Sequence, residues 1–186
     1  MTSAAVPFPG DAARERRLAE ILRVDHAGEF GAVQIYRGQR AVFDMAPSKA
    51  HISGLLADME AGEQTHLETF DRLLVERGVR PTIFAPLWRI AGFTLGAATA
   101  LMGEKAAHAC TAAVEDVIEK HYAEQARALD DLDPDLKATV EQFRADELHH
   151  KDTALAEGAA DAPGYRVMSA IIKFGCRAAI RISEKL

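Results

Sequence analysis

The sequence predicts an all-α protein built on a four-helix bundle, with one additional apolar helix and a basic amphipathic helix near the C-terminal end. Three observations support this class. Proline and glycine interrupt the chain at only a few places, and the stretches between them repeat apolar residues at spacings of three and four. Acidic residues also recur midway along four of these apolar stripes. The six helices expected are residues 12–44, 49–77, 87–103, 105–131, 135–157 and 165–184.

Capping residues and composition set the limits of these elements. Asp11, Ser48 and Asp133 lie near helix starts, where their side chains suit N-capping. A chain of 186 residues that is 48% hydrophobic and 27% charged is long enough for one well-packed domain. We therefore expect a single domain over residues 1–186, with residues 1–11 as a flexible tail.

Charge and cysteine usage exclude several classes of function. A net charge of −6 argues against a general nucleic-acid binder, which would normally carry a basic stripe. Cys110 and Cys176 are far apart and form no disulfide framework, which indicates a reducing compartment. The first residues contain no apolar run long enough for a signal peptide, so the protein is expected to act where it is made.

The first two helices carry polar residues on the faces that should be buried. At spacings of three and four, the inward stripe of the first helix contains Asp25 and Glu29. The same spacing places Glu63 and His66 on the inward stripe of the second helix. A buried ionised carboxylate is costly unless it is paired or bound to a metal, so both stripes require a cationic partner.

The third helix is apolar except for Arg89. Its length of about 17 residues is at the lower limit for a membrane-spanning helix, and the flanking basic residues argue against full spanning. We therefore expect residues 81–104 to form an apolar segment that faces the membrane and lies on it or dips into it. Small residues that permit close helix approach recur every four positions: Gly92, Gly96 and Ala100.

The fourth and fifth helices repeat the pattern of the first two. The inward stripe of the fourth helix contains Glu115 and, seven residues later, Tyr122. The fifth contains Glu147 and His150. The order along the chain is thus Glu, Glu-x-x-His, Glu, Glu-x-x-His.

The last helix combines apolar residues with Lys173, Arg177 and Arg181 at spacings of four. This basic amphipathic pattern suits an anionic bilayer surface, so we expect peripheral membrane association. The alternative is that this helix and the apolar segment 81–104 only pack against the bundle or form an interface between copies of the chain.

The repeated pattern predicts a dinuclear metal site. Four buried glutamates carry four negative charges, which two ferrous ions balance, and two neutral imidazoles complete the set. One Glu from each of two helices plus two Glu-x-x-His pairs is the pattern of ferritin-like di-iron and di-manganese bundles. The candidate metal ligands, through which catalysis would also proceed, are Glu29, Glu63, His66, Glu115, Glu147 and His150.

Four neighbouring residues are left out of the ligand set. Glu60 does not stand three residues before His66, and His149 points away from the site face. Asp25 could hydrogen-bond a ligand histidine or make a cap or a salt bridge. Tyr122 is interpreted first as a core tyrosine, with a place beside a substrate or electron path as the alternative.

Three stretches give the sequence a family resemblance. They are ILRVDHAGEFGAVQIYRGQ, RPTIFAPLWRIAGFTLGAATALMGEKAAHACTAAVE and FGCRAAIRISEKL. Together they resemble the demethoxyubiquinone hydroxylases of ubiquinone biosynthesis, from about Arg17 onward. The resemblance implies the same six ligands and hydroxylation of a demethoxylated polyprenyl benzoquinol by O₂. It also implies two iron ions per chain and an external reductant, with NADH as a candidate source.

The resemblance further implies a location at the cytoplasmic face of a bacterial inner membrane, or at the matrix side of the mitochondrial inner membrane in a eukaryote. A ferroxidase or a manganese-catalase-like bundle shares the six ligands, but it does not explain the apolar third helix. A rubrerythrin-type electron carrier would need more cysteines, and a nonenzymatic assembly protein would not need the full ligand set. The tail length, the electron donor, a homo-oligomer, a lipid-presenting accessory protein and the breadth of substrates stay open.

Overall fold

A computed structural model describes residues 10–185 of the chain and confirms the all-α prediction. Each expected helix is present, with ends that differ from the expected ones by no more than two residues. Two short 3₁₀ helices, η1 (Pro47–Lys49) and η2 (Ala159–Asp161), lie in the connections. The helices are α1 (Asp11–Phe43), α2 (Ala50–Glu76), α3 (Ala85–Leu101), α4 (Glu104–Leu129), α5 (Pro134–Ala156) and α6 (Tyr165–Lys185).

The predicted caps are correct at one position of three. Asp133 caps α5, because its side chain accepts a hydrogen bond from the backbone N–H of Leu136 at 3.0 Å. Asp11 is instead the first residue of α1 and follows Gly10 at the N-cap, while Ser48 lies in η1. Asp11, the last residue of the predicted tail, is therefore helical, and residues 1–9 of that prediction lie outside the described part of the chain.

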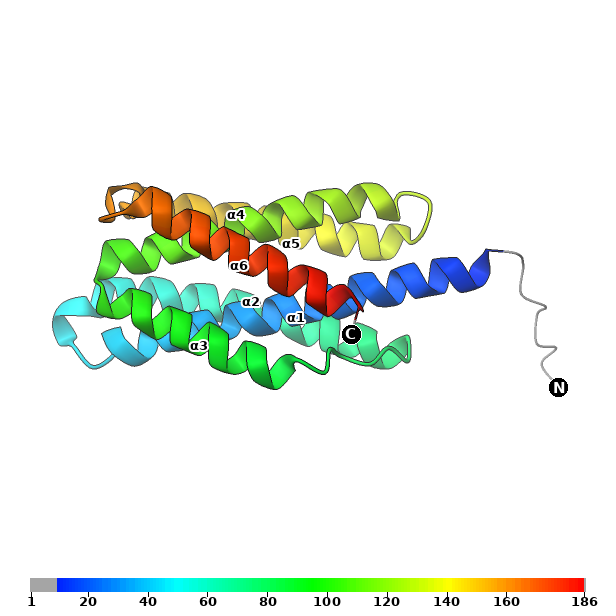
Figure 1. Cartoon of the computed structure of the whole chain (residues 1–186), viewed down its shortest axis with the longest axis horizontal. Coiled ribbons are helices and arrows are strands. Elements are labelled where there is room, and N and C mark those ends of the chain that lie inside the picture. The colour runs from blue at the N-terminus through cyan, green and yellow to red at the C-terminus, as the bar shows by residue number, and fades with distance from the viewer. Residues whose placement is uncertain (1–9, 186) are drawn as a thin grey trace.

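Helices α1, α2, α4 and α5 form the bundle, and α3 and α6 lie on one side of it (Figure 1). Helix α1 packs against α2 and α3, whereas α4 packs against α5 and α6. Helix α6 also reaches α1, so α3 and α6 together cover the side of the bundle where α1 and α4 meet.

The core is built from the inward stripes that the periodicity predicts. The buried residues of α5 are the same six that spacings of three and four select: Leu136, Val140, Phe143, Glu147, His150 and Ala154. The two inward tyrosines, Tyr36 and Tyr122, are each 1% exposed. The bundle therefore has an apolar interior interrupted at mid-height by a layer of polar side chains.

Close contact between α1 and α3 depends on glycine. A Cβ added to Gly96 would lie 2.0 Å from the carbonyl oxygen of Ile35, and one added to Gly38 would lie 2.2 Å from that of Phe93. Backbone atoms cannot yield by so much, so only glycine permits this separation. The small-residue pattern of the third helix thus packs α3 onto α1.

Helix α6 is held to α4 by an ion pair that changes the interpretation of one basic residue. Nζ of Lys173 lies 2.8 Å from Oδ2 of Asp116. Burial opposes ionisation of Asp116, but its hydrogen bonds with Lys120 and Lys173 lower its pKa to about 2. Lys173 therefore has a protein partner, while Arg177 and Arg181 are exposed.

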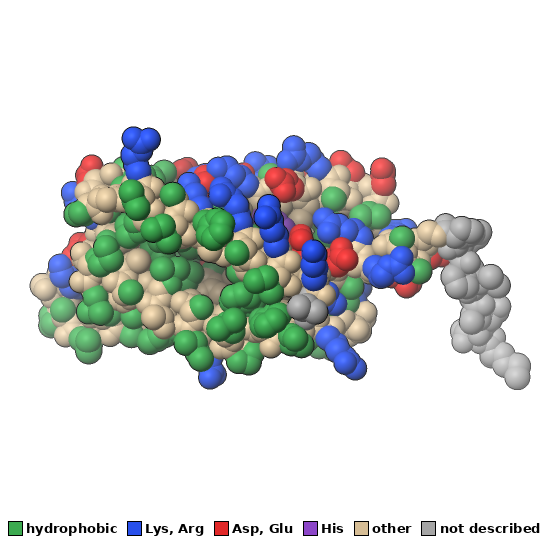
Figure 2. Space-filling view, in the orientation of Figure 1, with side chains coloured by type: hydrophobic (Ala, Val, Ile, Leu, Met, Phe, Trp, Pro, Cys, Tyr) green, Lys and Arg blue, Asp and Glu red, His purple; other side chains and the backbone are tan. Residues whose placement is uncertain are grey.

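Large apolar side chains remain exposed on α3 and α6. Figure 2 shows them beside a hollow between the two helices, with Lys and Arg side chains along α6. Within residues 10–185, no helix has the length and apolarity needed to cross a membrane. The large apolar side chains that are exposed on α3 and α6 are Leu87, Ile90, Phe93, Leu101, Val167, Ile171, Phe174 and Ile182.

Candidate metal centre

The six predicted ligands meet at mid-height in the bundle. Their donor atoms form two groups, each with all of its atoms within 4.8 Å of one another. One group contains Glu29 and His66, and the other contains Glu115 and His150. Glu63 and Glu147 belong to both groups, as expected of carboxylates that would bridge two metal ions.

Buried donor atoms without partners provide a test of whether these residues fit a metal. A buried polar atom normally has a hydrogen-bond partner, so a concentration of orphans at one place requires an explanation. Metal ions would satisfy all of them, and the donor set of carboxylate oxygen and imidazole nitrogen suits iron or manganese. The orphaned atoms in the cluster are Oε2 of Glu29, Glu63 and Glu115, both carboxylate oxygens of Glu147, and Nδ1 of His66.

Both histidines turn the same ring nitrogen towards the carboxylates. Nδ1 of His66 lies 3.3 Å from Oε1 of Glu147 and 3.6 Å from Oε2 of Glu29. Nδ1 of His150 lies 3.0 Å from Oε1 of Glu63. The position that a Glu-x-x-His pair gives to its histidine thus leaves Nδ1 as the donor atom and directs Nε2 away from the cluster.

Burial and the closeness of the carboxylates shift the pKa values of the cluster residues. Burial raises the pKa of Glu63 and Glu115 well above the ordinary value, and the neighbouring charge of Glu147 raises both further. Burial opposes the charged form of His66, but Glu147 and Glu29 raise its pKa to about 10. Glu29 has a lowered pKa, because its contacts with His66, Glu63 and Tyr122 outweigh burial. The carboxylates of the cluster thus concentrate negative charge in the core, and bound cations would offset it.

Two tyrosines donate hydrogen bonds to the outer carboxylates, Glu115 and Glu29, each of which belongs to only one of the two donor groups. The sequence pattern singles out Tyr122 but not Tyr36. The hydroxyl of Tyr36 donates to Oε1 of Glu115 at 2.6 Å, and that of Tyr122 donates to Oε1 of Glu29. Burial raises the pKa of both tyrosines well above 10, so both keep their protons. Tyr36 stands seven residues after Glu29 on the same stripe, which places it in the core but does not reveal its partner on α4.

The residues left out of the ligand set lie outside the cluster. Glu60 pairs with Arg37 and Arg40, and His149 is exposed. Asp25 contacts no ligand histidine: its Oδ1 accepts a 2.6 Å hydrogen bond from Nε2 of Gln125 and lies 3.7 Å from Nε2 of His121. A carboxylate outside the predicted ligand set does contact one of the two histidines: Oδ2 of Asp146 lies 3.2 Å from Nε2 of His66, a contact that no periodicity signals.

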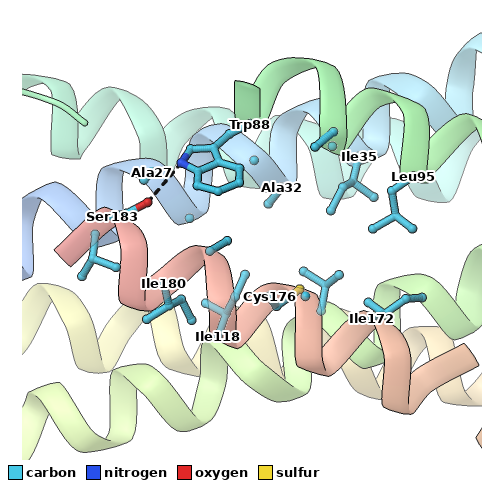
Figure 3. A pocket seen from close by; sticks show the side chains of 18 of the residues that line it. Ala27, Ala32, Ile35, Trp88, Leu95, Ile118, Ile172, Cys176, Ile180 and Ser183 are labelled. Atoms are coloured by element: carbon cyan, nitrogen blue, oxygen red, sulfur yellow. Dashed lines mark hydrogen bonds between the residues drawn. The ribbon is translucent and has the colours of Figure 1, made fainter. Parts of the chain in front are cut away.

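An apolar cavity of about 420 Å³ lies between α3 and α6 (Figure 3). Its walls are aliphatic or small almost throughout. At one end, Nε1 of Trp88 donates a 3.1 Å hydrogen bond to Oγ of Ser183. The cavity lining includes the residue before and the third residue after each of two predicted ligands, Glu29 and Glu115. These lining residues are Gly28, Ala32, Val114 and Ile118. The cavity therefore reaches the turns of α1 and α4 that carry these ligands.

The shifted pKa values predict that metal stabilises the protein more at higher pH. Raised carboxyl pKa values stabilise the metal-free fold at low pH, and this contribution is lost as pH rises through the folded-state values. Metal binding needs the deprotonated ligands, so it replaces the lost contribution. We expect the rise in melting temperature on adding Mn²⁺ to be larger at about pH 7.5 than at about pH 5.5. Equal rises at the two pH values would contradict this linkage.

Comparison with known proteins places the cluster in a family context. Residues 16–183 match the family model described as ubiquinone biosynthesis protein COQ7. The chain is 48% identical over 179 residues to a 3-demethoxyubiquinol 3-hydroxylase of Rhodospirillum rubrum, covering 96% of this chain and 83% of that protein. It is 45% identical over 170 residues to a mitochondrial NADPH-dependent 3-demethoxyubiquinone 3-hydroxylase of Homo sapiens, covering 89% and 76%. A mitochondrial 5-demethoxyubiquinone hydroxylase of Saccharomyces cerevisiae is 39% identical over 184 residues, covering 91% and 78%.

Proposed function

The chain belongs to the family of the ubiquinone biosynthesis protein COQ7, and on that premise we propose that it is a di-iron monooxygenase that hydroxylates 3-demethoxyubiquinol. The observation that carries the proposal is the conjunction of two features. A cluster of orphaned carboxylate and imidazole atoms lies in the bundle, and an apolar cavity lies against the turns that bear two of its members. In this proposal residues 1–186 form one domain.

The ligands in this proposal are the six residues that the sequence pattern selects. Glu29, Glu63, His66 and Glu147 would hold one iron ion, and Glu63, Glu115, Glu147 and His150 would hold the other. Bound ferrous ions would supply the site at which O₂ is reduced. The reaction takes two electrons and two protons, and it places one oxygen atom in the new hydroxyl group and the other in water.

The protein's own contribution is to fix the carboxylates and to keep water away. Tyr36 and Tyr122 each hold one oxygen of an outer carboxylate and stay protonated. This leaves the other oxygen of Glu115 and of Glu29 directed at the cluster. All four glutamates are 0% exposed, so bulk water does not reach them and reactive species are protected from side reactions.

The cavity would hold the substrate. An aromatic ring with a polyprenyl tail matches walls that are apolar, and Trp88 and Ser183 are the polar groups at one end. The tail cannot cross water freely, because each methylene that it buries contributes roughly 0.8 kcal/mol. The exposed apolar side chains of α3 and α6, with Arg177 and Arg181, would place the cavity against an anionic membrane surface.

The reductant would be a reduced nicotinamide nucleotide. The names of the mammalian relatives specify NADPH, whereas NADH is the candidate source that the family resemblance suggests. The rates at which the enzyme oxidises NADPH and NADH, measured separately, distinguish these two reductants. A ferroxidase or a manganese catalase would use the same cluster, but neither has a use for an apolar cavity beside it.

Complementation provides the functional test. Expressed in a strain that cannot hydroxylate demethoxyubiquinone, the chain should restore ubiquinone and remove the demethoxylated precursor, as measured by quinone analysis. With ¹⁸O₂, the purified enzyme should place label in the new hydroxyl group. Accumulation of the precursor despite soluble, iron-loaded protein would refute the proposed substrate, and a hydroxyl oxygen derived from water would refute the monooxygenase reaction.

A further inference from the structure

The two histidines of the cluster are supported unequally. Nε2 of His66 lies 3.2 Å from Oδ2 of Asp146, and the His66 ring stacks on Phe143 with centroids 3.9 Å apart and an interplanar angle of 25°. His150 meets the ring of Tyr36 edge-on, with centroids 6.3 Å apart. Throughout residues 10–185, no hydrogen-bond partner is found for Nε2 of His150. One ligand ring is thus fixed on two sides and the other is fixed less firmly.

Asp146 stands outside the ligand set but next to it. It directly precedes Glu147 on α5, and its side chain is 42% exposed. The groups of donor atoms in the cluster do not include it. It also accepts a 3.3 Å hydrogen bond from Nε2 of Gln142, one turn earlier on the same helix, which limits the rotamers of the carboxylate. Asp146 is therefore placed to act on the metal only through His66.

A carboxylate on the outer nitrogen changes what a histidine can do for a metal. When Nε2–H donates to Asp146, Nδ1 is the ring nitrogen that faces the cluster, so Nδ1 is the nitrogen that releases its proton and offers a lone pair to the metal. The negative charge also makes Nδ1 more basic. A ring that is already fixed loses less side-chain entropy on binding than one that must be ordered. All three effects favour the metal position beside His66 over the one beside His150.

We infer that Asp146 is a positioning residue, and that through His66 it makes the metal position shared with Glu29 bind more tightly than the position shared with Glu115. This rests on the metal centre of the proposed function. It predicts two separate binding constants for the two positions in one chain, with the stronger one dependent on Asp146.

The chain offers a matched control for the test. His26 also lies on a bundle helix, and its Nε2 is 3.0 Å from Oδ1 of Asp71, whose side chain is 61% exposed. Asp71 and Asp146 thus make the same kind of contact, but His26 is not a member of the cluster. Asp71→Ala removes a carboxylate–histidine pair without touching a ligand histidine.

Titration of metal-free protein with Co²⁺, followed by calorimetry and by the visible bands of bound Co²⁺, tests the inference. The parent and Asp71→Ala should each bind in two distinguishable steps. In Asp146→Ala the stronger step should weaken by roughly 10- to 100-fold while the weaker step is unchanged. Asp146→Asn keeps a hydrogen-bond acceptor without the charge, so the affinity of its stronger step should lie between those of the parent and Asp146→Ala. Circular dichroism should show the same helix content in every variant.

The outcomes separate this inference from the proposed function. Two Co²⁺ ions bound with the same two constants in the parent and in Asp146→Ala would overturn the role of Asp146. Equal weakening in Asp146→Ala and Asp71→Ala would assign the effect to the loss of any surface carboxylate and would also overturn it. A parent protein that binds no Co²⁺ would instead refute the metal centre on which the proposed function depends.

Discussion

Replacing Glu147 with alanine is expected to abolish metal binding at both positions and to lower hydroxylase activity by at least about 1000-fold, because this carboxylate belongs to both donor groups. Removal of one partner from a buried charge cluster typically costs about 3–5 kcal/mol, which corresponds to a loss of roughly 100- to 4000-fold in affinity. Glu115 belongs to one group only, so Glu115→Ala should lose about one metal ion per chain.

Metal analysis of purified, iron-loaded protein measures both effects. Glu60→Ala is the matched control, because Glu60 lies one turn before Glu63 on α2 and pairs with Arg37 and Arg40 outside the cluster. It should retain the parent stoichiometry. Circular dichroism distinguishes loss of a ligand from loss of the fold. Unchanged iron content in both Glu147→Ala and Glu115→Ala would rule out the ligand assignment.

Placing charge on the exposed apolar face of α6 is expected to weaken binding to anionic vesicles by at least about 100-fold. Val167 and Phe174 are 66% and 75% exposed on α6, and neither lines the cavity. Burying each in a bilayer contributes about 1.5–3 kcal/mol, and the double variant Val167→Glu, Phe174→Glu removes both contributions. Its two new negative charges also oppose an anionic surface by about 1 kcal/mol each.

Vesicle sedimentation at low salt measures this effect, and Val75→Glu provides the control. Val75 is 83% exposed on α2, which packs mainly against α1, so its substitution should leave vesicle binding unchanged. The double variant should keep its metal content and its turnover of a short-tailed, water-soluble quinol, while turnover of the long-tailed substrate in vesicles falls. If the double variant binds vesicles like the parent, this face is instead a packing surface or an interface between copies of the chain.

Only two of the three basic residues on the predicted stripe of α6 are suitable for a test of membrane attraction. Lys173 belongs to the predicted basic stripe, but its side chain pairs with Asp116 and so holds α6 against α4. A substitution of Lys173 would mix loss of membrane attraction with loss of helix packing. Arg177 and Arg181 are the exposed cations, so Arg177→Gln, Arg181→Gln isolates the electrostatic contribution, which should diminish as salt is raised.

The sequence by itself determined the helices, their inward faces and the six cluster residues. These features follow from local geometry: a helix repeats every 3.6 residues, so the spacing of Glu63 and His66, or of Glu147 and His150, fixes which residues share a face. The cost of burying a carboxylate then implies a metal without any knowledge of the neighbouring helices. The glycines of α3 likewise predict close packing before the partner helix is known.

Only the tertiary structure decided which side chains meet across the bundle. The hydrogen bond from Tyr36 to Glu115, the contact between Asp146 and His66, and the ion pair of Lys173 with Asp116 join helices that are far apart in the chain. Periodicity gives the face of a residue but not the rotation and axial position of the helix opposite. The cavity between α3 and α6 depends on the same quantities, because it is the space that two helices leave when each packs on a different half of the bundle.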